Sequence, residues 1–285
     1  MKYRMLAMLK IKLVEVVIDI WRRVGVQFAG TWVSKIPGVS RLHTYLAASI
    51  LNGKTHEVDG QKMVAIFDPA TKDLLYYTNN YEPLISSLFC SMLEEGMVVL
   101  DIGASLGYYT LLAAKRVGDK GEVIAFEPDP VAFCGLLENI RINGWKNVRA
   151  FQFAVSDSNG ERKMGNLTAH KSFAIKNNTI GIITVNTISL DSFLDVDGAE
   201  LEVINGMKKI LAKGKAKIIF EVTPSHLSSL GYSAEKIEEI LKQYNYNIYS
   251  ITKSGLIPVT SFKNIKNESV CDMYFFYKGE VMKWD

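Results

Sequence analysis

The chain of 285 residues is poor in cysteine and has no long apolar run. Its three cysteines are scattered and form no C-x-x-C pair, which excludes a disulfide framework and a cysteine zinc site. The four histidines also lack metal-ligand spacing, and we predict no metal site. Charges interrupt every apolar run before the ~18–20 residues of a membrane span, and the N-terminal stretch has no small-residue cleavage site. These absences predict a cytoplasmic protein without a signal peptide.

An excess of charge of one sign is also missing. The formal net charge is +3, which is too small to predict a nucleic-acid partner. The first 41 residues carry +6 and the remainder −3. Residues 3–24 repeat apolar side chains at three- and four-residue steps, which predicts an amphipathic helix. Two interpretations stay open: the helix packs on the rest of the protein, or it lies on an anionic inner-membrane surface as a peripheral contact.

The first 80 residues are expected to form an extension. Residues 31–60 are rich in turn signals and predict loops. Short apolar runs at 62–67 and 74–78 predict a small hairpin. We therefore expect a helical and hairpin extension over 1–80 and a main domain over 81–285, which opens with a helix through residue 93.

From Met97 onward, strand and helix patterns alternate regularly. Strands are predicted at 97–102, 122–126, 148–155, 217–222, 248–251 and 272–277, and helices at 107–117, 130–143, 200–212 and 233–244. This alternation is typical of an α/β, Rossmann-like doubly wound sheet with helices on both faces. We expect a mostly parallel sheet of seven strands.

The turn after the first of these strands indicates a nucleotide site. It reads Asp101-x-Gly103-x-x-x-Gly107, not the G-x-G-x-x-G of dinucleotide folds, and its acid would repel a pyrophosphate. A ligand with a cationic amino-acid end, such as S-adenosylmethionine, fits better. Glu127 ends the second strand, where a carboxylate is placed to hold a ribose.

Several ordered motifs resemble the FkbM family of S-adenosylmethionine-dependent methyltransferases over residues 80–251. They are Asp101–Thr110, Phe126–Pro130, Glu138–Gly144, Ala154–Asp157, Ser189–Leu194, Asp195–Glu200 and Phe220–Val222 with Pro224. The resemblance implies a class-I methyltransferase fold and methyl transfer to a hydroxyl of a sugar, glycan or other small polar molecule.

The cofactor site implied by the resemblance fits the chemistry of the side chains. Asp101 can accept hydrogen bonds around the methionine end, and Glu127 can accept both ribose hydroxyls. Val155 and Ser156 would flank the adenine. Asp157 either lies near its amino group or caps a local turn. The full set is Asp101, Gly103, Ala104, Gly107, Tyr109, Thr110, Glu127, Pro128, Val155, Ser156 and Asp157.

Four acids at predicted carboxyl ends of strands are candidates for catalysis: Asp195, Asp197, Glu200 and Glu221. Ligands bind at this edge of open α/β sheets. Clustered carboxylates raise one another's pKa, which suits a general base that takes a proton from an alcohol. The same oxygens could instead hold a divalent cation, although no ligand set is evident. Glu200 could also serve only as a first-turn helix acid.

Two other functions stay open. A nucleic-acid methyltransferase shares the fold, but the chain lacks the Asn/Asp-Pro-Pro-aromatic motif of enzymes that modify exocyclic amines. A non-catalytic S-adenosylmethionine-binding module is the second. It is favoured because Leu194 directly precedes Asp195, where the resembled family has a further segment containing its fourth strand. We predict that the natural protein carries such a segment. If Leu194 and Asp195 are truly bonded, the sheet is rebuilt and these acids are not catalytic.

Overall fold

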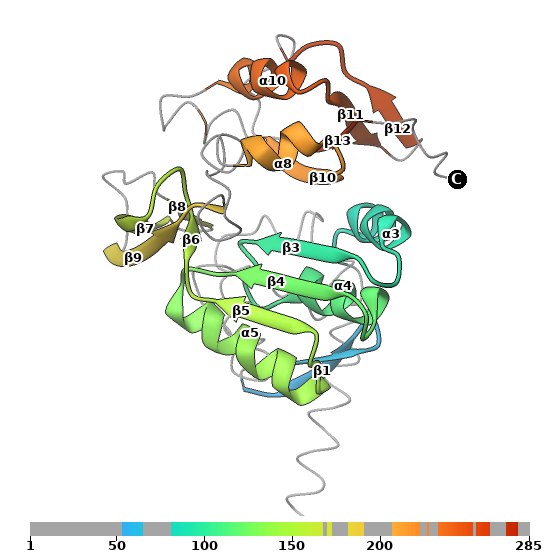
Figure 1. Cartoon of the computed structure of the whole chain (residues 1–285). Coiled ribbons are helices and arrows are strands. Elements are labelled where there is room, and N and C mark those ends of the chain that lie inside the picture. The colour runs from blue at the N-terminus through green and yellow to red at the C-terminus, as the bar shows by residue number, and fades with distance from the viewer. Residues whose placement is uncertain are drawn as a thin grey trace, which may run out of the picture. The chain divides into compact units, whose positions relative to one another are not determined.

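The computed structural model describes residues 53–64, 81–167, 170–172, 182–190, 207–222, 227, 233–252, 255–262 and 272–278 (Figure 1). The chain divides into two compact units, Met1–Tyr81 and Glu82–Asp285. The roles assigned to residues 1–80 and 81–285 stay predictions, and the expected helix over 3–24 lies outside the described residues. Within the described part of the chain, no helix is long and apolar enough to cross a membrane.

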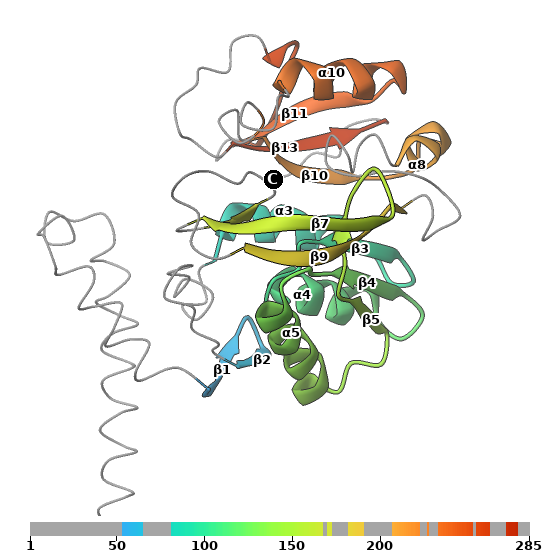
Figure 2. The same ribbon diagram turned by 90° about the vertical axis from the view of Figure 1, so that its left-hand side faces the viewer.

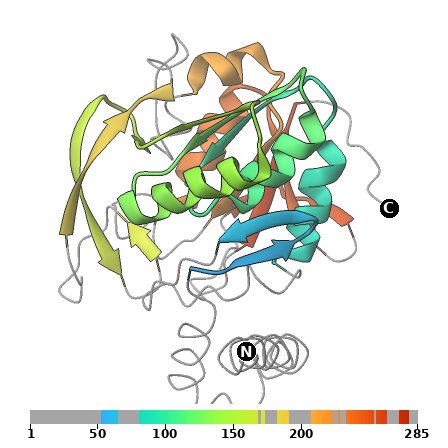
Figure 3. The ribbon, with the colours of Figure 1, turned by 90° about the horizontal axis from the view of Figure 1, so that it is seen from below.

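The first unit contains an antiparallel hairpin of β1 (Thr55–Val58) and β2 (Gln61–Val64) (Figure 3). Its two-residue turn is Asp59-Gly60, with φ of 49° and 72°. Positive φ at both positions is what a type I′ hairpin turn requires. Residues 55–58 are therefore a strand and not the loop that we predicted. Residues 62–64 belong to its second strand, while the expected partner at 74–78 lies outside the described residues.

The second unit begins with a parallel sheet built from two strand–helix repeats. It contains α3 (Pro83–Met92), β3 (Val98–Ile102), α4 (Tyr108–Val117), β4 (Glu122–Phe126), α5 (Pro130–Asn143) and β5 (Val148–Phe151). β3, β4 and β5 pair in that order, with Val99 opposite Val123 and Val123 opposite Val148 (Figure 1). The predicted strands and helices over 97–151 are confirmed to within one residue, apart from the end of the third strand.

β4 is buried on both faces, as a central parallel strand must be. Val123 packs with α4, and Ala125 packs with α5. The alternate residues Ile124 and Phe126 belong to a second core formed with the C-terminal half of the chain. Helices therefore cover both faces of this strand, which is the doubly wound arrangement.

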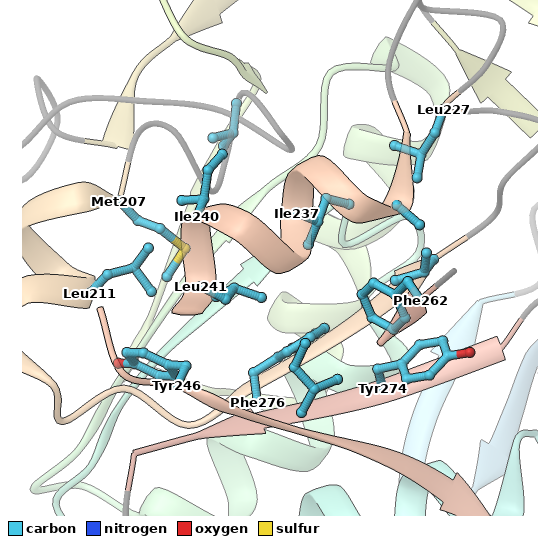
Figure 4. Close-up of a cluster of buried hydrophobic side chains, with 14 of the residues drawn as sticks. Met207, Leu211, Leu227, Ile237, Ile240, Leu241, Tyr246, Phe262, Tyr274 and Phe276 are labelled. Carbon is cyan, nitrogen blue, oxygen red and sulfur yellow. The ribbon is translucent and has the colours of Figure 1, made fainter. Parts of the chain in front are cut away.

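The C-terminal half forms an antiparallel sheet in the order β10-β13-β11-β12. Its elements are α8 (Lys208–Lys213), β10 (Ile218–Val222), α10 (Ala234–Gln243), β11 (Asn247–Thr252), β12 (Gly255–Pro258) and β13 (Asp272–Tyr277). Ile237 and Leu241 of α10 lie over Phe276 of β13 in the shared core (Figure 4). Of the predicted helix at 200–212, the structure describes only the part from residue 207.

A third sheet has the order β6-β9-β7-β8. Its paired strands β7 and β9 lie side by side in Figure 2. It contains β6 (Ala154–Val155), β7 (Gly160–Leu167), β8 (His170–Ser172) and β9 (Ile182–Ile188). The predicted single strand over 148–155 is thus two strands, and the second pairs in parallel with β9 instead of continuing β5.

In the described residues, the strands that would form one seven-stranded sheet lie in separate sheets. Among the described strands, β3 pairs only with β4, and β10 pairs only with β13. The apolar side chains Val98 and Ile102 of β3 are 64% and 38% exposed. Among the described strands, this differs from the single sheet that we predicted and agrees with the direct junction of Leu194 and Asp195, where the resembled family has a further segment. The junction of Leu194 and Asp195 itself lies outside the described residues.

Candidate cofactor site

The loop between β3 and α4 is held against the end of β4 by its backbone. The amides of Gly103 and Ala104 both donate to the carbonyl of Phe126, at 2.9 Å each. Gly103, Ser105 and Gly107 all have positive φ, at 80°, 50° and 92°. The loop therefore needs residues that tolerate the left-handed region at three positions in five.

The two glycines of this loop have different surroundings. A Cβ on Gly103 would meet nothing within 4 Å, so its backbone faces open space where a ligand can approach. A Cβ on Gly107 would lie 2.6 Å from Cδ1 of Leu136, a fully buried side chain of α5. Gly107 therefore allows α5 to approach the start of α4, whereas the space beside Gly103 is open, and its contact with a cofactor stays a prediction.

Glu127 is the best-positioned acid of the site. It is 7% exposed. Its Oε2 accepts from the amide of Ser105 at 2.8 Å, and its Oε1 accepts from the amide of Asp129 at 2.8 Å. The carboxylate is thus fixed by the loops that follow β3 and β4, at the edge where open α/β sheets bind ligands.

Neighbouring residues keep these loops in place. Asp129 is the N-cap of α5 and accepts from the amides of Val131 and Ala132 at 3.1 and 2.9 Å. The fully buried Asn139 of α5 donates to the carbonyl of Leu106 at 2.8 Å. Pro128 is half-buried between the two acids. Our sequence analysis missed Asn139 and Ser105, because the hydrogen bonds that reveal them join residues more than twenty positions apart.

Asp101 lies near the end of β3 and accepts a hydrogen bond from the hydroxyl of Thr110 on α4. Burial raises the pKa of Asp101 above its ordinary value, and the hydrogen bonds from Thr110 oppose part of this shift. Tyr109, the residue beside Thr110, donates its hydroxyl to Oε2 of Glu82 at 2.7 Å. This contact joins residues 27 positions apart and was not predicted; it brings a further carboxylate to the start of α4.

The segment assigned to the adenine follows β6. Val155 and Ser156 are buried, and the Ser156 hydroxyl accepts from Arg162 at 3.0 Å. Asp157 is exposed and accepts from the hydroxyl of Ser158 at 3.0 Å. Asp157 thus makes a local turn contact, which was one of our two interpretations, and its contact with adenine stays a prediction.

Of the four catalytic candidates, the structure places only Glu221. It is an exposed residue near the carboxyl end of β10. Asp195, Asp197 and Glu200 lie outside the described residues. Among the residues that are described, no group of three or more His, Cys, Asp or Glu side chains could hold a metal ion.

This strand–loop–helix site with an acid after the next strand is that of a nucleotide-binding α/β protein. A family model described as the methyltransferase FkbM domain matches residues 101–248, about half of the chain. The chain therefore belongs to the FkbM methyltransferase family. Membership implies S-adenosyl-L-methionine as the cofactor, and the fixed Glu127 carboxylate and the open backbone at Gly103 fit this molecule.

Two relatives and one solved structure illustrate the similarity. The chain is 30% identical over 166 residues to the hexuronic acid methyltransferase AglP of Haloferax volcanii, covering 52% of this chain and 67% of that protein. It is 33% identical over 99 residues to a tRNA(Phe) (4-demethylwyosine(37)-C(7)) aminocarboxypropyltransferase of Methanocaldococcus jannaschii, covering 35% of this chain and 39% of that protein. The crystal structure of methyltransferase FkbM from Methylobacillus flagellatus aligns at 14% identity with a TM-score of 0.42, covering 86% of this chain and 60% of that chain. The chain thus spans about two thirds of the first of these proteins and less of the other two.

Proposed function

We propose that this protein transfers a methyl group from S-adenosylmethionine to a hydroxyl of a sugar, a glycan or another small polar molecule. The observation that carries the proposal is the Glu127 carboxylate, which two backbone amides hold at the edge of the parallel sheet. The name of the Haloferax volcanii relative, a hexuronic acid methyltransferase, favours a sugar acceptor.

In this proposal, each part of the site binds one part of the cofactor. Glu127 accepts hydrogen bonds from the ribose hydroxyls, and its own bonds to Ser105 and Asp129 orient it beforehand. The backbone at Gly103 lies against the ligand because no side chain intervenes. The buried Ser156 and Val155 form the wall expected beside the adenine.

The chemistry asks little of the protein beyond position and one proton transfer. The cofactor supplies a methyl group on a sulfonium, which is already a good leaving group. The protein holds the acceptor hydroxyl in line and removes its proton. We assign the proton to a carboxylate among Glu221, Asp195, Asp197 and Glu200, with a divalent cation as the alternative means of acidifying the hydroxyl.

Calorimetry with S-adenosylmethionine tests the cofactor site. Glu127→Gln keeps the size of the side chain but removes its charge and leaves only one oxygen for the amides of Ser105 and Asp129. A hydrogen bond to a charged group contributes about 1.5–3 kcal/mol. We expect binding to weaken on the order of 10- to 100-fold, since each 1.4 kcal/mol is tenfold. Glu95→Gln is the matched control, because Glu95 is exposed and its ion pair with Lys120 lies on the surface. Unchanged affinity in a folded Glu127→Gln protein would show that the ribose assignment is wrong.

Transfer of labelled methyl groups tests the acceptor. We expect label on free hexuronic acids or glycans that contain them, and none on tRNA. A deletion strain should lose 14-dalton increments from its glycans or lipids. Label on tRNA alone would replace the sugar proposal by the nucleic-acid alternative.

The separation of β3 from β10 favours a second candidate, a module that binds S-adenosylmethionine without transferring its methyl group. Tight cofactor binding without transfer to any sugar, glycan or tRNA would support this candidate. The cytoplasmic location and the membrane contact through residues 3–24 stay predictions in either case.

A further inference from the structure

Side chains at the start of α3 are fixed to the first turn of α4. The Tyr109 hydroxyl donates to Glu82 Oε2 at 2.7 Å, and the hydroxyls of Ser86 and Tyr108 lie 3.1 Å apart. The Tyr109 ring also meets Phe89 edge to face, with centroids 5.2 Å apart. Burial and the charge of Glu82 raise the pKa of the Tyr109 hydroxyl, so it remains a donor at neutral pH. Glu82 therefore has a defined position although it is exposed.

The backbone of Glu82 has an unfavourable conformation that its own helix does not explain. Its φ and ψ are 41° and 57°, in the left-handed region that side chains other than glycine, asparagine and aspartate rarely adopt. It is the N-cap of α3, yet its side chain makes no cap hydrogen bond. An N-cap side chain ordinarily accepts from the first amides of the helix. Here the carboxylate is directed to α4 instead, and such strained residues tend to lie at functional sites.

Glu82 is directed to the first turn of α4, which directly follows the loop assigned to the cofactor. Tyr109 is two residues after Gly107, and its neighbour Thr110 bonds to Asp101. Glu82 and Asp101 are thus both tied to the first turn of α4, beside the loop that contains the open backbone of Gly103. Of the parts of S-adenosylmethionine, only the methionine end carries an ammonium group. The carboxylate of Asp101 already accepts the hydroxyl of Thr110 and burial raises its pKa, whereas Glu82 is exposed and can be approached by a ligand.

We infer that Glu82, oriented by the Tyr109 hydroxyl, is the anionic partner of the methionine ammonium of S-adenosylmethionine. The inference rests on the cofactor of the proposed function and adds a binding residue that lies outside the family motifs found in the sequence. Tyr109 acts through Glu82 and is a positioning residue.

Three ligands test which group Glu82 recognises. S-adenosylmethionine carries the ammonium and the sulfonium, S-adenosylhomocysteine carries only the ammonium, and 5′-methylthioadenosine carries neither. For Glu82→Gln, we expect calorimetry to show binding of the first two weakened about 5- to 20-fold and binding of the third unchanged. Tyr109→Phe should give the same pattern with a smaller loss. Glu82 makes no cap bond, and glutamine can still accept from the Tyr109 hydroxyl, so Glu82→Gln should leave the thermal midpoint unchanged.

The outcomes separate this inference from the proposed function. Loss of affinity for S-adenosylmethionine alone would assign Glu82 to the sulfonium and overturn the inference. An equal loss for all three ligands, or no loss for any of them, would also overturn it. A wild-type protein that binds none of the three ligands would instead overturn the cofactor site as a whole. Glu95→Gln, an exposed glutamate after α3, should bind all three as the wild type does.

Discussion

Alanine should mainly reduce stability at Gly107 and mainly reduce cofactor binding at Gly103. At Gly107, a Cβ would lie 2.6 Å from Cδ1 of Leu136, and the residue has φ of +92°. A left-handed non-glycine residue costs about 1–2 kcal/mol, and overpacking a core adds about 1–3 kcal/mol. Gly107→Ala should therefore destabilise by about 2–5 kcal/mol, a large part of the ~5–15 kcal/mol of a typical domain.

At Gly103, only the conformational cost applies, because nothing lies within 4 Å of the added methyl group. Gly103→Ala should lose about 1–2 kcal/mol of stability. The methyl group would, however, enter the space assigned to the cofactor. We therefore expect folded Gly103→Ala protein to bind S-adenosylmethionine more weakly than folded Gly107→Ala protein does. Urea unfolding and calorimetry on both variants measure the two effects. Equal stability losses, or full affinity in Gly103→Ala, would refute this division of roles.

Two further substitutions test supports of the fold. Asp129→Ala removes the N-cap of α5 and should cost about 0.5–2 kcal/mol in urea unfolding, whereas a cost near zero would show that the cap bonds contribute nothing. At Glu238, partial burial raises the pKa, but hydrogen bonds led by Lys242 and the amide of Phe262 outweigh it, so the pKa lies below its ordinary value of 4.5. This acid therefore stabilises the fold above about pH 4.5 and loses that contribution as pH falls through the lowered folded pKa. Thermal midpoints of Glu238→Gln should depend less on pH below 4.5 than those of the wild type, and parallel profiles would contradict the assignment.

The sequence predicted the βαβ segment well because its patterns are local. The apolar runs of β3 and β4 each end in an acid, and Asp129-Pro130 marks the start of α5 by a capping side chain and a residue suited to the first helical turn. The sequence also indicated Glu127 as a site residue, since an acid at the end of the second strand of such a unit is placed at the ligand edge.

The rest required information that local patterns do not contain. The strand β7 (Gly160–Leu167) is mostly polar, so its pairing with β9 left little hydrophobic signal. The turn Asp59-Gly60 was a hairpin signal, but it lay in a segment dominated by loop residues. Glu82 is a candidate for cofactor binding only through its contact in the folded protein with Tyr109, which is 27 positions away in the sequence.

The last prediction concerns the further segment, with a fourth strand, that the resembled family has where Leu194 directly precedes Asp195 in this chain. β3 and β10 each have one hydrogen-bonded neighbour among the described strands, and Val98 and Ile102 of β3 are partly or largely exposed. We expect that inserting, between Leu194 and Asp195, a segment with the apolar pattern of a buried parallel strand will place a strand between β3 and β10. Each new backbone hydrogen bond contributes a net of about 0.5–1.5 kcal/mol. This roughly offsets the conformational entropy lost by each residue that becomes ordered, which costs ~1–2 kcal/mol.

Burial of Val98 and Ile102 therefore decides whether the insertion raises or lowers the free energy of unfolding, since full burial of such a side chain contributes about 1.5–3 kcal/mol. The urea midpoint should rise and the β3 amides should exchange more slowly with solvent, whereas a glycine–serine insertion of equal length should do neither. If the two insertions behave alike, β3 and β10 do not accept a strand, and the sheet is rebuilt around its loss. In that case Asp195, Asp197 and Glu200 have no parallel strand to bring them to the cofactor, and the non-catalytic binding module becomes the better account of this chain.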